Sequence, residues 1–170
     1  MDAAFDKYFA MSNILQDDIE VLLDVKDDSQ NSRRNFIRAA AALIEGYAHC
    51  FREMCELGVA TGAGPLTSKE VQVIQAERSF DSAERIKLTL RAAYKSFQLP
   101  SVPEFGDEGW QHAQILIEKR DRLMHPKSVK DLEVPDALWA DIHEGTKWLF
   151  RQLFGFMEQL AIVHGPNDGR

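Results

Sequence analysis

The sequence contains few cysteines. Only Cys50 and Cys55 occur among its 170 residues. They lie five residues apart within a helical pattern, so their side chains should point in different directions, and this separation matches no zinc-ligand spacing. We therefore expect reduced thiols rather than a disulfide or a zinc site, with Cys50 in the core.

A phosphate-binding loop and a metal site are also missing from the pattern. The glycine cluster Gly62-Ala63-Gly64-Pro65 is not followed by Gly-Lys-Ser/Thr, so it predicts a loop that closes a helix within 58–65. The histidines are scattered, and no pair of carboxylates has the spacing of a bridged di-metal site on helices. We expect no metal and no cofactor.

No apolar run is long enough to span a bilayer, and no basic or apolar leader opens the chain. The sequence therefore predicts a soluble, cytoplasmic protein without a membrane partner. Its net charge of −7 argues against a protein that coats nucleic acid by bulk electrostatics.

No segment shows convincing strand alternation, whereas apolar residues recur at spacings of three and four along most of the chain. The spacing predicts a first helix over 3–26, with one break allowed near Met11, and a second that carries the clearest stripe, Phe36, Ala40, Leu43, Tyr47, Cys50, Met54 and Leu57. A capping box at Thr67 and Glu70 opens a short helix, and Asp81 opens another that runs to about Gln98.

Two further helices complete the pattern. One runs backward from Met124 to Trp110, and the last follows Pro135, where more than one face is apolar and indicates either a second packing partner within the bundle or a homodimer face. We predict an all-α fold, an up-and-down antiparallel helical bundle of four long helices plus one or two short helices. It should form a single domain over 1–165, with a frayed tail over 166–170.

The stretch Lys119–Lys130 stands out by charge. It carries five cations and one acid, a balance of +4 that leaves the remainder of the chain at −11. A basic site on an acidic body can still focus an anionic substrate. Alternatively, such cations simply suit the negative end of a helix dipole. Arg120 falls on the apolar stripe of its helix, where a permanent charge needs a partner or a wet cleft, and Pro126 should end the helix near His125.

The run Arg120-Asp121-Arg122-Leu123-Met124-His125, followed by Pro126, resembles the R-x4-6-H signature of HEPN-domain proteins, in which Asn, Asp or His commonly follows the arginine. This resemblance implies a metal-independent endoribonuclease with Arg120, His125 and Asp121 as catalytic residues. RNA would be the partner, bound through the flanking cations Arg122, Lys127 and Lys130.

The same resemblance implies that a polar residue of an early helix approaches the motif arginine. Glu45 is the candidate, with Arg38 on the same side of the second helix as support. A homodimer in which both motifs line one cleft, a toxin or antiviral defence role, and a nucleotidyltransferase-type antitoxin are further expectations from the family. Two alternatives remain open: a non-catalytic HEPN-like module that binds a nucleotide or a protein partner, and a purely structural pair of Arg120 and Glu45 with His125 as a helix cap.

Overall fold

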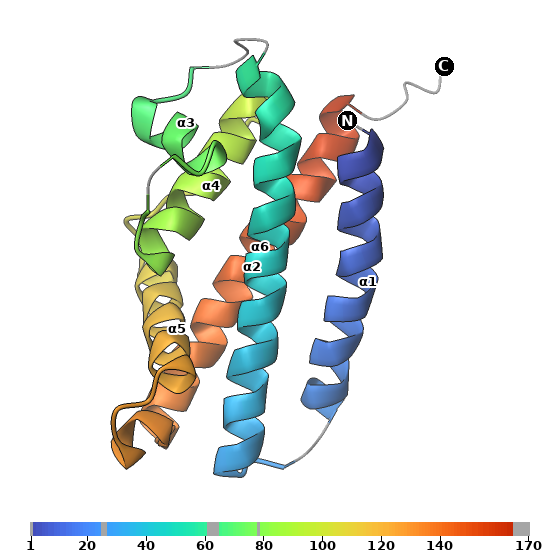
Figure 1. The fold of residues 1–170 in the computed structure, drawn as a ribbon. Coiled ribbons are helices and arrows are strands. Elements are labelled where there is room, and N and C mark those ends of the chain that lie inside the picture. Colours follow the sequence, from blue (N-terminus) through green and yellow to red (C-terminus); the bar gives the residue numbers. More distant parts are fainter. Residues whose placement is uncertain (1, 25–26, 61–64, 78, 165–170) are drawn as a thin grey trace.

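The computed structural model describes residues 2–24, 27–60, 65–77 and 79–164. All regular structure in these residues is helical, which confirms the predicted all-α bundle (Figure 1). Four of the α-helices have 17 or more residues, and two are shorter. In chain order the elements are α1 (Asp2–Asp24), α2 (Gln30–Ala60), α3 (Ser68–Ile74), α4 (Ser82–Ser96), α5 (Glu108–Met124), the 3-10 helix η1 (Val129–Leu132) and α6 (Asp136–His164).

Helix α2 lies at the centre of the bundle. Figure 1 shows α1 along one side of it, α4 and α5 one after the other along the opposite side, and α6 crossing behind. The predicted stripe of α2 is buried from Phe36 to Met54, and the largest enclosed side chains of the molecule include Tyr47 and Phe51 from this helix. The last member of the stripe, Leu57, has a side chain outside the described residues. The central helix therefore offers a polar edge to α4 and α5 while its apolar side faces the core.

The predicted starts of α3 and α4 are confirmed. The Thr67 hydroxyl accepts from the backbone N–H of Glu70, and the Glu70 carboxylate accepts from the N–H of Thr67, which completes the capping box before α3. Asp81 caps α4 and Asp107 caps α5 in the same manner, each through its carboxylate. These caps fix where the helices that carry the site begin.

The extra apolar face of α6 packs inside the bundle. Trp148 lies against Trp110 and Phe105, with ring centroids 5.6 and 5.7 Å apart, and its indole N–H donates to Asp107. Trp139 meets Phe36 of α2 edge to face at 5.3 Å. The second apolar face thus has a packing partner within the chain, which was one of the two predicted arrangements.

Three details differ from the sequence prediction. Helix α1 is unbroken, and Tyr8 is its buried aromatic residue, whereas Phe9 is 56% exposed because α1 packs mainly on α2. Helix α2 continues through Ala60, into the stretch expected to be loop. Leu123 replaces Met124 in the core, since the connection from α5 to α6 folds over the Leu123 side.

Other predictions fall partly outside the described residues. These include the glycine cluster 61–64 and the tail 166–170. Cys50 and Cys55 are both buried and form no disulfide, as expected. No helix in the described part of the chain is long and apolar enough to cross a membrane.

Candidate functional site

The motif helix ends where Pro126 predicts. Helix α5 stops at Met124, and His125 is its C-cap residue, with φ −130° and ψ 59°. The backbone N–H of His125 still donates to the carbonyl oxygen of Asp121 at 3.1 Å. His125 is therefore attached at the end of α5, and the chain after it is no longer α-helical.

Arg120 is the centre of an ion-pair network. Its side chain is only 19% exposed, and its two terminal nitrogens meet different carboxylates: Nη2 pairs with Glu45 from the middle of α2, and Nη1 pairs with Asp121 at 2.6 Å. The predicted contact between Glu45 and the motif arginine is thus present. The Ser82 hydroxyl, at the start of α4, lies 3.4 Å from the Asp121 carboxylate. Three helices meet at this guanidinium.

A second arginine shares the same carboxylate. Nη2 of Arg85, on α4, lies 3.5 Å from Oε1 of Glu45, the same oxygen that pairs with Arg120. We call Glu45, Arg85, Arg120 and Asp121 the Arg120 cluster. Beneath it is a cavity of only about 10 Å³, lined by aliphatic side chains and by Glu45 and Arg120, so the polar groups rest on a closed apolar floor. Partial burial of this kind strengthens the attraction between the charges.

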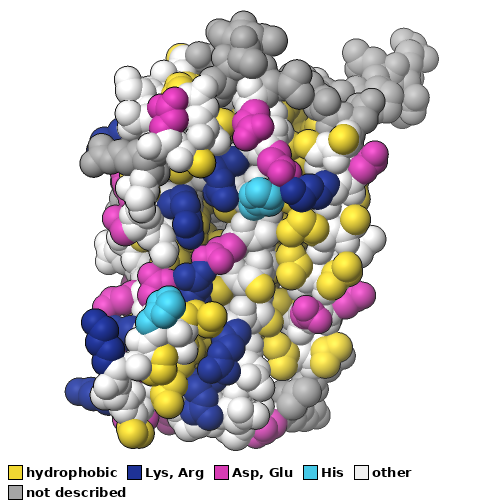
Figure 2. Space-filling model, in the orientation of Figure 1, with side chains coloured by type: hydrophobic (Ala, Val, Ile, Leu, Met, Phe, Trp, Pro, Cys, Tyr) yellow, Lys and Arg dark blue, Asp and Glu magenta, His cyan; other side chains and the backbone are white. Residues whose placement is uncertain are grey.

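Arg52 of α2 adds a further positive charge near the Arg120 cluster. It is half-buried, and its Nη1 donates to the Thr89 hydroxyl at 3.3 Å rather than to a carboxylate. Burial, followed by the positive charge of Arg85, lowers the pKa of Arg52. Arg52 thus adds a positive charge next to Arg85 of the cluster, and such a gathering of positive charge favours an anion. Figure 2 shows this face, with basic side chains among acidic ones along the seam between α2 and the α4–α5 side.

The sequence prediction missed Arg52 and Arg85. Both residues border the apolar stripe of their helix, and neither belongs to a recognisable sequence motif. Only the packing of α4 against α2 brings Arg85 to Glu45, so no local signal would have identified it. Arg52 lies on α2, seven residues after Glu45, and this helical spacing was the signal that could have placed it on the same side. The one hint is that Arg85 lies one turn after the Asp81 cap, on the part of α4 that faces the motif helix.

His125 lies at the exposed edge of the site. Its side chain is exposed and forms no hydrogen bond or ion pair within the described part of the chain. Asp121, four residues earlier, is on the same side of α5, and residues at this spacing have Cβ atoms about 5–6 Å apart. Asp121 directs its carboxylate to Arg120 and Ser82. It therefore stands between the arginine and the histidine, and its hydrogen bonds orient the arginine.

The remaining predicted residues are more dispersed. Arg122 pairs with Glu118 one turn back on α5, away from the Arg120 cluster. Lys127 and Lys130 are exposed beyond the helix end, and neither side chain forms an ion pair within the described residues. Arg38 is exposed two turns before Glu45 on α2 and donates to Asn35. The structure thus brings Glu45, Arg120 and Asp121 into contact. The predicted cations Arg38, Arg122, Lys127 and Lys130 lie at the surface and form no ion pair with them.

Lys119 has a different role from its neighbours. It is 6% exposed, and its ammonium donates to the carbonyl oxygens of Asp131 and Glu133 at 2.7 and 2.6 Å. Burial, followed by the charge of Arg122, lowers the pKa of Lys119. The side chain ties the segment after His125 back onto α5. This tie holds the exposed rim of Lys127 and Lys130 in place.

No group of histidine, cysteine or carboxylate side chains in the described ranges is arranged to hold a metal ion. The charged and titratable groups that the site offers are arginine, histidine and carboxylate side chains. Comparison with known proteins adds no relative: no protein family, curated protein or solved structure matches this chain.

Proposed function

We propose that the protein is a metal-independent endoribonuclease of HEPN type whose site is the Arg120 cluster together with His125. The observation that carries the proposal is the placement of Arg120. Its guanidinium is held by carboxylates from two helices, beside two further arginines. Five residues later, at the end of the same helix, comes the exposed imidazole of His125, which forms no hydrogen bond or ion pair within the described residues. A proton acceptor and a cluster of phosphate-binding groups at one edge suit phosphodiester cleavage.

In the proposed reaction, neutral His125 takes the proton of a ribose 2′-hydroxyl, since the intrinsic pKa of imidazole lies near working pH. The 2′ oxygen attacks the adjacent phosphorus, and the bond from phosphorus to the 5′ oxygen breaks. The leaving oxygen takes a proton from solvent. The products are a 2′,3′-cyclic phosphate and a free 5′-hydroxyl.

Arg120 would hold the negative charge that develops on the phosphorane oxygens. A guanidinium has five N–H donors, and Glu45 and Asp121 occupy one terminal nitrogen each, so donors remain for a phosphate oxygen. The carboxylates fix the plane of the fork before substrate arrives, which lowers the cost of reorganisation during the reaction. Asp121 acts here as a positioning residue for Arg120.

Arg52 and Arg85 would bind the phosphates next to the scissile one. They lie where α4 packs against α2, whereas Lys127 and Lys130 lie beyond His125, and Arg122 is exposed on α5 beside Glu118. The RNA strand would then cross the end of α5 with His125 near the middle of its path. This arrangement accommodates RNA on a chain with net charge −7, because the stretch Lys119–Lys130 carries a local balance of +4.

The direct test incubates the purified protein with transfer and ribosomal RNA in the presence of a chelator, followed by end-group analysis. The parent should leave 2′,3′-cyclic phosphates, and His125→Ala should leave none. His49→Ala is the matched control, since His49 is also exposed and lies far along α2 beside Glu53. Equal cleavage by parent and His125→Ala would reject the proposed site.

The arginines have their own controls. Arg120→Gln should abolish cleavage, and Arg85→Gln should weaken RNA binding while leaving residual cleavage. Arg151→Gln serves as control, because Arg151 is exposed on α6 and forms no ion pair within the described residues. If Arg151→Gln lowers cleavage as much as Arg85→Gln, Arg85 has no specific role in binding RNA.

The second candidate is a non-catalytic module that binds a nucleotide or a protein partner. One observation favours it: both terminal nitrogens of Arg120 already face carboxylates, so the pair would persist without any chemistry. In that case no RNA end would carry a cyclic phosphate, and titration with a nucleotide would perturb the Arg120 cluster in the parent but not in Arg120→Gln. The third alternative, a purely structural pair, predicts neither cleavage nor binding.

Homodimerisation is proposed at the same edge. Met124 and Val129 are apolar side chains 54% and 77% exposed, and both flank His125. Covering them with a second copy would bring the two motifs to one cleft. Light scattering should give a dimer mass that Val129→Asp lowers to the monomer, and a monomeric parent at micromolar concentration would reject this interface. The toxin or defence role and the nucleotidyltransferase-type antitoxin remain predictions from the family resemblance.

A further inference from the structure

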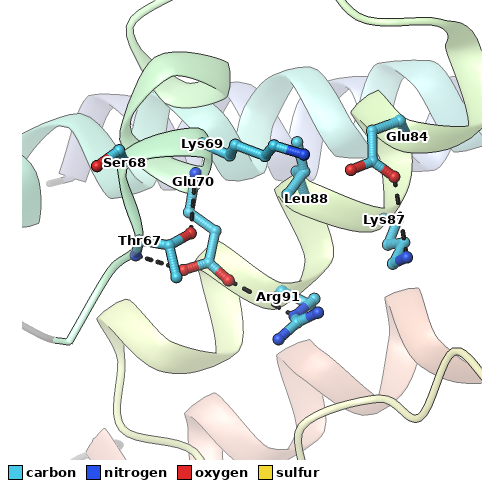
Figure 3. Close-up of a pocket in the computed structure, with 8 residues that line it drawn as sticks. All are labelled: Thr67, Ser68, Lys69, Glu70, Glu84, Lys87, Leu88 and Arg91. Atoms are coloured by element: carbon cyan, nitrogen blue, oxygen red, sulfur yellow. Dashed lines mark hydrogen bonds and ion pairs between the residues drawn. The ribbon is translucent and has the colours of Figure 1, made fainter.

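A separate pocket lies where α3 packs on α4. Its volume is about 430 Å³, within the range of small-molecule sites. Figure 3 shows its walls: Lys69 extends from α3 toward α4, and residues of α4 line the opposite side. The complete lining is Thr67, Ser68, Lys69, Glu70, Glu84, Lys87, Leu88 and Arg91.

The base of this pocket is a buried carboxylate. Glu70 is 1% exposed, and its oxygens accept from the backbone N–H of Thr67 at 2.7 Å and from Lys95 at 2.8 and 3.0 Å. Burial by itself would raise the pKa of Glu70, but the Lys95 ammonium and the Thr67 donors outweigh it and hold the pKa below its usual value. Glu70 and Lys95 therefore satisfy each other and give the pocket a fixed polar floor.

The cations of the walls retain free donors. Lys69 forms no hydrogen bond or ion pair in the described part of the chain. Lys87 pairs loosely with Glu84, at 3.8 Å, and its ammonium lies over the Phe105 ring, 6.0 Å from the ring centroid. Arg91 approaches Glu70 through Nε at 3.5 Å, which leaves its two terminal nitrogens available. The lining holds three cations and two carboxylates, Glu70 and Glu84, and Lys95 beneath it neutralises Glu70, so the site with Lys95 carries a balance of +2 on a protein of net charge −7. A concave site with this charge attracts a small anion.

The uncharged part of the lining limits the kind of anion. Leu88 is the single apolar residue among the eight, and none of the eight is aromatic, so a nucleobase would find no stacking partner among them. The hydroxyls of Thr67 and Ser68 and the carboxylate of Glu84 can instead exchange hydrogen bonds with hydroxyl groups. A ligand rich in hydroxyls, with one strongly charged group, suits this lining best.

We propose that this pocket binds a small phosphorylated sugar or polyol. The phosphate would lie among Lys69, Lys87 and Arg91, and the hydroxyls would face Ser68 and Glu84. The Arg91 guanidinium supplies a planar fork for two phosphate oxygens, while the two ammonium groups add charge. The floor of Glu70 and Lys95 positions Arg91 at the base.

This site is independent of the proposed ribonuclease. Glu84, Lys87, Leu88 and Arg91 follow one face of α4 at spacings of three and four, whereas Arg85 belongs to the face that meets Glu45 of α2. The two sites therefore lie on different sides of the same helix. Binding in the pocket can succeed or fail whether or not RNA is cleaved.

The experiment records amide chemical shifts of the 19.3 kDa chain during titration with glucose 6-phosphate, with glucose and a short single-stranded RNA as comparisons. Glucose 6-phosphate should shift the amides of 67–70 and 84–91 and leave those around Arg120 in place. Glucose alone should shift none of them. Shifts of equal size with glucose, or no shift at millimolar glucose 6-phosphate, would overturn the proposal.

Variants identify the cations that bind. Lys69→Gln and Arg91→Gln should each weaken binding by roughly tenfold, because each removes a charge-assisted contact to phosphate. Lys69 is exposed and has no partner among the described residues, so its replacement does not threaten the fold. Lys147→Gln, on α6, is the control and should bind as the parent does. Unchanged affinity in both pocket variants, or a preference of these amides for the RNA over the sugar phosphate, would contradict the assignment.

Discussion

Helix α5, which carries Arg120, and helix α6 approach closely at Gly145 of α6, and this contact yields a sharp stability prediction. A Cβ atom at Gly145 would lie 2.4 Å from the carbonyl oxygen of His112 and 2.8 Å from the backbone nitrogen of Ala113, both on α5. Ordinary contacts between such atoms are about 3.5 Å. Since the obstacles are backbone atoms, no side-chain rotation relieves the clash, and Gly145→Ala must move α5 and α6 apart by about 1 Å.

Overpacking of this kind costs about 1–3 kcal/mol, and the better helix propensity of alanine returns up to about 1 kcal/mol. We therefore expect a net loss of about 1–2 kcal/mol for Gly145→Ala, equivalent to a fall in Tm of about 2–8 °C for a chain of this size. Gly155 in the same helix is the matched control. A Cβ there would meet only the Tyr94 hydroxyl, at 3.6 Å, so Gly155→Ala should be neutral or stabilising by up to about 1 kcal/mol.

Urea denaturation of the parent and both variants measures this difference. The midpoint should fall for Gly145→Ala and hold or rise for Gly155→Ala, with similar slopes for all three proteins. Because α5 carries Arg120 and His125, Gly145→Ala should also lower RNA cleavage while the protein remains folded. Equal stability of the two variants would refute the close crossing of α5 and α6, and with it the argument that this crossing sets the position of the motif.

Charged and buried groups give three more testable outcomes. Glu45→Gln removes the carboxylate shared by Arg120 and Arg85, so RNA cleavage should be lost. The free energy of unfolding should change by no more than about 1 kcal/mol, because the ion pair is partly exposed. Cleavage assays and urea midpoints measure the two effects separately. Folding lowers the pKa of Glu70, so the stability that this carboxylate contributes is present above the ordinary glutamate pKa and is lost as the pH falls through the pKa of the folded state. Glu70→Gln should therefore reduce the loss of stability between neutral and acidic pH, as measured by urea midpoints. Burial raises the pKa of the Cys55 thiol to about 12, so a thiol reagent at pH 8 should label it only after denaturant is added, and rapid labelling of the native protein would contradict its burial.

Local sequence signals predicted most of the helices because the forces behind them are local. The caps at Thr67 and Asp81 and the stop imposed by Pro126 depend on residues within one turn of the helix end. The core stripe of α2 was also predictable, because a long run of apolar residues at helical spacing is typical of a helix with one buried face. Exposure at helix ends was less predictable, as Met124 shows: its position on the stripe is correct, but the chain after α5 covers Leu123 instead.

Some contacts of the candidate site could likewise be predicted from the sequence, and others could not. The contact of Glu45 with Arg120 was predicted because the family resemblance supplied a partner and the helical spacing indicated which face carried it. Arg85 was not predicted, since its contact with Glu45 depends on how α4 packs against α2 across a connection without motif residues. Arg52 was not predicted either, although it follows Glu45 by seven residues on α2; its link to the site is its proximity to Arg85 of α4. Lys119 was grouped with the solvated cations, whereas its buried bonds to two carbonyl oxygens require the folded connection after His125.

Both proposed sites reconcile an acidic chain with an anionic ligand by the same physical means. In the Arg120 cluster, Glu45 and Asp121 hold two arginines without cancelling the additional charge of Arg52. In the pocket of α3 and α4, Glu70 pairs with Lys95 and approaches Arg91 only through Nε, so the terminal nitrogens of Arg91 and the ammonium of Lys69 remain for a ligand. Partly buried carboxylates thus position cations at fixed points, while the negative charge elsewhere keeps other polyanions away from the surface. Specificity for an anion then depends on the geometry of a few arginines and lysines, and not on the net charge of the protein.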